Sequence, residues 1–211
     1  AQGTVLQYPI QYDPVNDLFE TVGRDQGQIG GVYTPNHTQV GTFGNFSSSD
    51  GQHLDGTLDI THNRTLASNY TYGQILRYND GFFNSPTTVQ YDTTDFDVWS
   101  VAWSSNDVTY VGRNGFIELI NDGGGVLGGF ATPDGPVRSL AWDASDNTLW
   151  YLSIDGSTAV QFSTNGQMLD RFAVNLGGNY WGGEIKPVPE PATMAALGLG
   201  TIALIRRRRR K

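Results

Sequence analysis

The chain has 211 residues, contains no cysteine and carries a formal net charge of −8. The absence of thiols excludes a disulfide framework, a thiol nucleophile and a zinc–thiolate site. Residues 1–185 hold six arginines against 20 of the 21 acidic residues, a formal charge of −14, and such a surface repels nucleic acid and anionic lipid.

The first 185 residues are long enough for one domain with a substantial core. Their pattern predicts all-β structure, because no long apolar stripe with the helical period occurs and turn residues recur at short intervals. Short runs rich in aromatic and β-branched residues read as strands. The clearest of these runs are Val98–Trp103, Val108–Val111, Phe116–Ile120, Leu149–Ile154 and Ala159–Phe162.

Four units with a common pattern follow one another along this part of the chain. In order they cover residues 10–43, 58–78, 99–130 and 138–172, and the second matches least well. Trp103 and Trp142 occupy the same place in the last two units, 39 residues apart, and Tyr12 stands there in the first. A period near 40 residues is typical of the four-stranded blade of a β-propeller. The repeat favours about four antiparallel blades over a β-sandwich, which short strands with regular turns would also fit.

Each unit has an apolar strand that ends in an aromatic residue and is followed by a turn rich in Asp, Asn and Ser. We expect the side-chain oxygens at 13–17 and 143–146 to accept hydrogen bonds from the backbone N–H groups of their own turns. We also expect the tryptophans to lie between neighbouring blades. The body resembles extracellular propellers of the NHL and WD-repeat-like kind. Four units are few for a propeller, and two explanations remain open. Either residues 179–185 supply a closing strand to the first blade, or further blades precede Ala1.

Catalytic and metal-binding motifs are weak in these residues. One metal or acid–base cluster can be drawn, from His53, Asp55, Asp59 and His62. The interpretation as solvated turn residues is favoured, because no metal-binding spacing such as His-Glu-x-x-His occurs. The turn at 143–147 likewise lacks the ligand spacing of a calcium loop. The sequence therefore predicts no enzyme activity, no metal and no cofactor.

The last residues have three parts in order: a short polar motif, an apolar run and a cationic end. The motif is Val188, Pro189, Glu190 and Pro191, and the cationic end is Arg206, Arg207, Arg208, Arg209, Arg210 and Lys211. The apolar run 192–205 predicts a helix of about 21 Å, which crosses a hydrocarbon core of ~30 Å only with local thinning and snorkelling arginines. Positive flanks stay in the cytoplasm, so residues 1–185 lie outside.

This order of parts resembles the PEP-CTERM sorting domain, the tail that bacterial exosortases recognise and process. The resemblance covers about the last 24 residues. It implies that the protein is exported after removal of a signal peptide and is transiently inserted into the inner membrane. It also implies that an exosortase recognises residues 189–191, that the tail is cleaved, and that the protein is delivered to the cell surface or to extracellular polysaccharide. The chain then divides into an extracellular body, 1–185, and a sorting signal, 186–211. The start at Ala1 fits either a processed chain or a fragment.

Two functions from different classes follow from these features. The first is a non-enzymatic surface or matrix protein whose body binds polysaccharide or another protein, with Tyr180 and Trp181 as the ligand platform. The second is an extracellular carbohydrate-active hydrolase or lyase with carboxylates around the propeller channel, which rests on fold analogy. The second requires a pocket with at least two carboxyl groups, and a plugged channel would count against it.

Overall fold

A computed structural model describes residues 7–23, 30–42, 51–79, 88–93, 95, 97–174 and 181–186. These residues form 16 β-strands in four sheets of four strands each. Every neighbouring pair within a sheet is antiparallel, and the strands of each sheet follow chain order. We call the sheets blades 1 to 4.

The strand bounds show that each blade is one continuous stretch of chain. Blade 1 contains β1 (Gln7–Asp13), β2 (Leu18–Gly23), β3 (Gly31–Tyr33) and β4 (Gln39–Thr42). Blade 2 contains β5 (His53–Asp59), β6 (Arg64–Asn69), β7 (Gln74–Asn79) and β8 (Thr88–Asp92). Blade 3 contains β9 (Ser100–Trp103), β10 (Thr109–Gly112), β11 (Asn114–Ile120) and β12 (Val126–Pro136). Blade 4 contains β13 (Leu140–Asp143), β14 (Thr148–Leu152), β15 (Thr158–Ser163) and β16 (Met168–Ala173).

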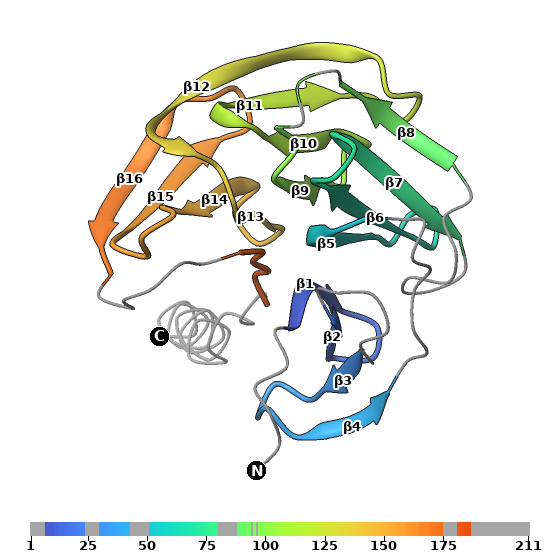
Figure 1. Cartoon of the computed structure of the whole chain (residues 1–211). Helices are drawn as coiled ribbons and strands as arrows, with labels where there is room; N and C mark the ends of the chain where they lie inside the picture. Colours follow the sequence, from blue (N-terminus) through green and yellow to red (C-terminus); the bar gives the residue numbers. More distant parts are fainter. Residues whose placement is uncertain are drawn as a thin grey trace, which may run out of the picture.

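The four blades surround a common centre, with β1, β5, β9 and β13 innermost (Figure 1). The predicted propeller of four antiparallel blades is therefore confirmed, and the β-sandwich alternative is wrong. The proposed closing strand is also wrong for the described part of 179–185: residues 181–186 form no strand, and blade 1 already has four strands of its own.

Apolar side chains fill the space between blades 2 and 3 and the space between blades 3 and 4. One cluster joins blades 3 and 4 and consists of Ala102, Tyr110, Ile117, Val137, Leu140, Trp142, Leu149, Tyr151, Val160 and Phe162. Another joins blades 2 and 3 and consists of Leu66, Ile75, Tyr91, Val98, Val101, Trp103, Val111 and Ile120. Tyr110 stacks on Trp142 across the first interface, with ring centroids 6.0 Å apart. The expected placement of Trp103 and Trp142 between blades is thus confirmed.

The turns that leave the four innermost strands share a residue with positive φ at their end. Asp13 Oδ1 accepts a hydrogen bond from the backbone N–H of Val15 at 2.8 Å, and Asp143 Oδ1 accepts one from Ser145 at 2.9 Å. The expected Asx turns are therefore confirmed. Each turn ends in a residue with positive φ: Asp17 (54°), Asn63 (50°), Asp107 (58°) and Asn147 (63°). Asn and Asp tolerate this left-handed conformation better than other residues with a side chain.

The predicted membrane helix at 192–205 lies outside the described residues. Within the part of the chain that the structure describes, no helix has the length and apolar character to cross a membrane.

Candidate functional site

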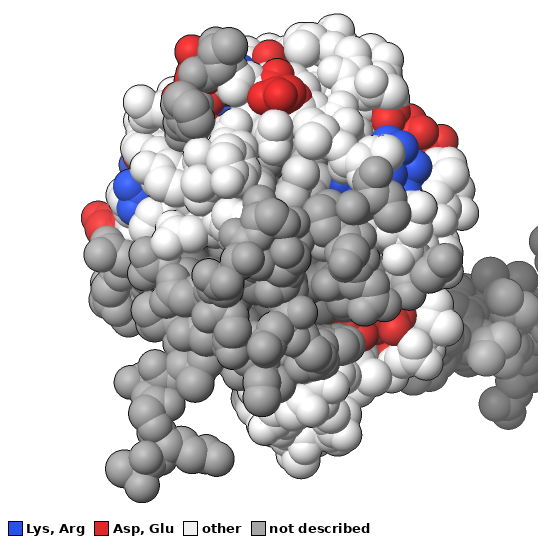
Figure 2. All heavy atoms as spheres, turned by 45° about the vertical axis from the view of Figure 1, so that its right-hand side comes forward, with Lys and Arg blue, Asp and Glu red and all other residues white. Residues whose placement is uncertain are grey.

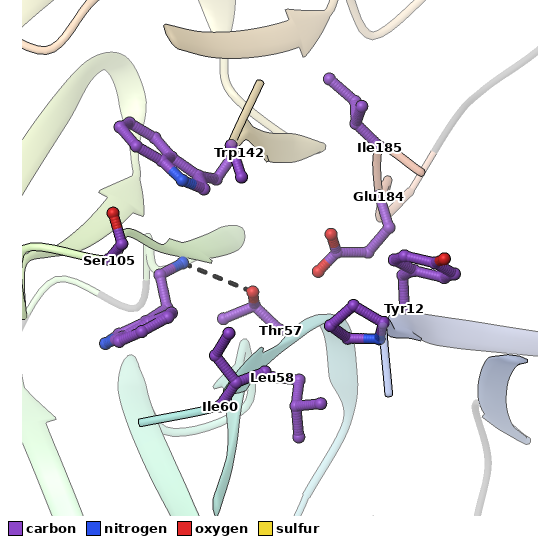
Figure 3. A pocket seen from close by; sticks show the side chains of 11 residues that line it. Tyr12, Thr57, Leu58, Ile60, Ser105, Trp142, Glu184 and Ile185 are labelled. Atoms are coloured by element: carbon purple, nitrogen blue, oxygen red, sulfur yellow. Dashed lines mark hydrogen bonds between the residues drawn. The ribbon is translucent and has the colours of Figure 1, made fainter. Parts of the chain in front are cut away.

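A pocket opens at the centre of the propeller, on the side where the four innermost strands end. Each blade contributes the residue just before its Asx or Ser turn: Tyr12, Leu58, Trp103 and Trp142. Each blade also contributes the residue two positions further on: Pro14, Ile60, Ser105 and Ala144. Thr57, Glu184 and Ile185 complete the lining, and the cavity measures about 170 Å³. The repeat thus places equivalent residues of all four blades around one cavity (Figure 3).

Residues 181–186 run along the centre of the propeller and link its two ends. At one end Trp181 stacks on Trp99, which directly precedes β9, with ring centroids 5.8 Å apart. At the other end Glu184 and Ile185 line the pocket, and Lys186 Nζ lies 2.6 Å from Asp17 Oδ1 in the first turn of blade 1. Figure 1 shows this segment in red between β13 and β1. We call residues 181–186 the axial segment.

Backbone contacts hold the axial segment in place. The N–H of Gly182 donates to the carbonyl of Arg138 at 3.0 Å, and the N–H of Gly183 donates to Asp55 Oδ1 at 3.1 Å. Gly182 has φ +72°, and a Cβ there would meet the Leu54 carbonyl oxygen at 3.0 Å. Glycine is therefore required at this position, both for its conformation and for the close approach to β5.

The carboxylate of Asp55 joins three blades and the axial segment. Its Oδ2 accepts hydrogen bonds from the N–H groups of Val101 and Leu140, both at 3.2 Å, and its Oδ1 accepts those of Gly56 and Gly183, both at 3.1 Å. The side chain is fully buried. Burial raises the pKa of Asp55 well above its usual range, and the four N–H donors act in the opposite direction.

Among the described residues that line the pocket, Glu184 is the one acidic residue. The Thr57 hydroxyl beside it in the pocket accepts a hydrogen bond from the backbone N–H of Trp103 at 3.4 Å. Burial and the nearby charge of Asp55 raise the pKa of Glu184 well above its usual range, against the smaller opposite effect of Thr57 and the Ile185 backbone. Sequence reasoning missed Glu184, although the residue lies in the short stretch between the predicted strands and the sorting motif.

The cluster drawn from the sequence is not one site. His53, Asp55 and Asp59 are fully buried in β5, so their interpretation as solvated turn residues is wrong. Tyr78 Oη lies 2.5 Å from His53 Nε2, and burial lowers the pKa of His53 to about 3, which keeps the ring neutral. Asp59 and His62 do lie together, with Asp59 Oδ2 2.9 Å from His62 Nδ1.

Asp59 and His62 join Asp122 in a group whose ligating atoms all lie within 4.8 Å of one another. Two guanidinium groups already contact these carboxylates. Arg64 Nε donates to Asp59 Oδ2 at 2.6 Å and its Nη2 contacts Asp122, while Arg77 Nη2 lies 3.1 Å from Asp122 Oδ1. A cation would have to displace these arginines, so the arrangement fits an ion-pair network between blades 2 and 3 better than a metal site.

The predicted ligand platform is described in part. Tyr180 lies outside the described residues. Trp181 is partly buried, and the Arg138 guanidinium carbon lies 4.1 Å from its ring centroid and 4.3 Å from that of Trp99. Trp181 therefore contributes to the packing of the axial segment at the end of the propeller opposite the pocket. Its role as a ligand platform stays a prediction.

These observations define the class of protein. The chain has a four-bladed β-propeller body whose centre is occupied by its own axial segment, and an aromatic pocket lies at one end. The predicted motif 188–191 and cationic end 206–211 lie outside the described residues, but comparison with known families identifies them: residues 187–210 match the model described as the PEP-CTERM protein-sorting motif. The chain therefore carries a PEP-CTERM sorting motif, which implies processing by an exosortase, export and sorting to the cell surface.

The body is similar in fold to a chain in the crystal structure of a nidogen/laminin complex. The TM-score is 0.62 and the sequence identity is 14%, over 85% of this chain and 68% of that chain. At this identity the likeness concerns the fold alone. No curated protein matches the chain in sequence.

Proposed function

We propose that this protein is exported through its PEP-CTERM motif and binds a polysaccharide or another protein at the cell surface or in the extracellular matrix. The pocket at the propeller centre is the observation that carries the proposal. Three of its walls are aromatic side chains, Tyr12, Trp103 and Trp142, which supply large contact areas at low cost in conformational entropy. All four blades converge there, so the fold itself holds the pocket open and in shape.

A binding role is favoured over hydrolysis or lysis of carbohydrate. A glycosidase needs two carboxyl groups about 5–9.5 Å apart across the substrate. Among the described residues that line the pocket, only Glu184 carries a carboxyl group. The second central carboxylate, Asp55, is fully buried and accepts four backbone hydrogen bonds, so it supports the fold rather than facing a ligand.

The binding proposal is tested on a glycan array and by capture of proteins from the matrix of the producing cells. Ile60 lies on the pocket rim and is 51% exposed, so Ile60→Arg places a long side chain over the opening with little effect on folding. Val126→Arg, at a 59% exposed site on β12, is the matched control. We expect Ile60→Arg to abolish binding and Val126→Arg to preserve it. No ligand in either assay, or equal binding by both variants, would refute the proposal.

The sorting part is tested by the intact mass of the protein recovered from membrane, surface and medium fractions of its own cells. We expect a species that lacks the residues beyond about Pro189, found at the surface or in the medium. Full-length protein retained in the membrane would show that the tail is a permanent anchor, and processing by an exosortase would then be excluded.

A further inference from the structure

Glu184 is an acid without a basic partner in the described part of the chain. Each described lysine and arginine contacts another group: Arg64, Arg77, Arg113, Arg171 and Lys186 form ion pairs with aspartate or glutamate, and Arg138 packs against Trp99 and Trp181. None of these ion pairs involves Glu184. A partly buried carboxyl group without a counter-ion costs stability, and such groups are typical of binding and catalytic sites.

The surroundings of Glu184 are apolar and aromatic. Figure 3 shows its carboxylate pointing into the space between Trp142, Tyr12 and Thr57. Trp142 is only 8% exposed, and its indole nitrogen has no hydrogen-bond partner among the described residues. Aromatic rings attract cations through their negative faces, and this attraction grows where water is excluded. The aromatic walls and the carboxylate therefore favour the same kind of ligand group, a cation.

On these grounds we infer that the pocket holds the side chain of one lysine from a partner protein, with Glu184 as its counter-ion. This inference rests on the proposed binding function and narrows it to one kind of ligand. A lysine side chain has an apolar stem and a compact cationic tip. The pocket offers matching surroundings: the apolar lining residues Pro14 and Ile60 are exposed to solvent, whereas Glu184 is partly buried.

The size and polarity of the pocket favour a side chain over a sugar. Pockets for drug-sized ligands enclose about 300–1,000 Å³, whereas this cavity measures about 170 Å³. A sugar ring needs several hydrogen-bonding groups around it. Here the Thr57 hydroxyl already accepts the backbone N–H of Trp103 at 3.4 Å, and the Tyr12 hydroxyl donates to Asp17 Oδ1 at 2.8 Å. Ser105 remains as a further hydroxyl.

The charge of the body supports a basic partner. Residues 1–185 carry a formal charge of −14. In Figure 2 the acidic groups appear at several separate places on the visible face rather than in one patch. The negative charge raises the rate of encounter with any basic protein, because it attracts positive groups from all sides. The pocket then selects a particular lysine.

The test is titration of the full-length chain in detergent micelles with a capped glycine peptide that carries one central lysine, followed by tryptophan fluorescence. The matched probe carries norleucine, which has a similar stem and no charge. We expect only the lysine peptide to bind, and Glu184→Gln to weaken its binding about tenfold or more. Asp92→Asn, at an exposed site on β8, removes one negative charge elsewhere and should leave the affinity within about twofold.

Several results would overturn the inference. Equal binding of the lysine and norleucine peptides, or equal weakening by Glu184→Gln and Asp92→Asn, would show that Glu184 is not the counter-ion. Tighter binding of a glucosamine oligomer than of the lysine peptide, lost in Glu184→Gln, would assign the pocket to an amino sugar. If neutral glycans bind, Ile60→Arg prevents that binding and the lysine peptide does not bind, the proposed function stands and this inference alone is refuted.

Discussion

Replacement of Asp55 by asparagine tests whether one carboxylate holds the propeller together. Asparagine has the same shape as aspartate but keeps one acceptor oxygen and replaces the other with an NH₂ donor. In the wild-type protein Oδ2 accepts from Val101 and Leu140, and Oδ1 accepts from Gly56 and Gly183. Whichever way the amide is turned, two buried N–H groups face a donor instead of an acceptor.

The expected loss follows from those two groups. A buried N–H without an acceptor costs about 1–3 kcal/mol, which gives about 2–6 kcal/mol for the pair. Removal of a buried charge offsets part of this loss, because burial already raises the pKa of Asp55 and disfavours the ionised form. We therefore expect Asp55→Asn to lower the free energy of unfolding by about 2–4 kcal/mol. This is a large share of the total free energy of unfolding of a typical domain, which is about 5–15 kcal/mol.

Urea unfolding followed by tryptophan fluorescence measures this loss, since the chain has five tryptophans. Asp143→Asn is the matched control, because asparagine caps an Asx turn nearly as well as aspartate and the loss should stay below about 0.5 kcal/mol. A loss below about 1 kcal/mol for Asp55→Asn, or equal losses for both variants, would refute the role assigned to Asp55.

Three further predictions concern the axial segment. A chain that stops after Lys186 should be as stable as the full-length protein. A chain that stops after Tyr180 should have a free energy of unfolding in urea that is lower by about 3–5 kcal/mol, because it lacks the Trp181 ring contacts and two backbone hydrogen bonds. Gly182→Ala should cost about 1–2 kcal/mol, because alanine is strained at positive φ. Wild-type stability should fall as the pH rises above the ordinary glutamate range, since the pKa of Glu184 is raised on folding and the folded state then binds more protons than the unfolded state. Glu184→Gln should reduce this slope and raise stability at pH 8.

Each of these predictions has a result that contradicts it. Equal melting of the two truncated chains would show that the axial segment does not stabilise the blades. A neutral Gly182→Ala would mean that the segment can shift away from β5. If the dependence of stability on pH is the same in Glu184→Gln as in the wild-type protein, Glu184 titrates alike in the folded and unfolded chain. The pH dependence would then come from Asp55, whose pKa is also raised.

The blade pattern was predictable because its signals are local. A strand, an Asx turn and a returning strand lie within about 15 residues, and the side-chain chemistry of the turn fixes where the chain reverses. The alignment of Tyr12 with Trp142 also held: both directly precede the first turn of their blades and both line the pocket. The alignment also indicated where the pocket lies, because residues at one position of blades arranged around an axis meet at that axis.

The role of Asp55 could not be predicted, because its partners are distant in sequence. Leu140 and Gly183 lie 85 and 128 residues away along the chain. Within β5 the aspartate alternates with other polar residues and resembles an ordinary surface position, so the burial of His53 and Asp59 was missed for the same reason. Only closure of the blades brings backbone N–H groups from three directions to one carboxylate.

The axial segment ends directly before the sorting motif, so the position of a cut decides whether the segment stays with the body. Its last residue, Lys186, pairs with Asp17 in the first turn of blade 1, and the matched sorting motif begins at residue 187. Cleavage within the motif preserves the contacts of Trp181, Gly182 and Gly183 with the blades, whereas cleavage before 181 removes them. A body released by cleavage within the motif would therefore keep Glu184 in its pocket, so such processing is compatible with the proposed binding function.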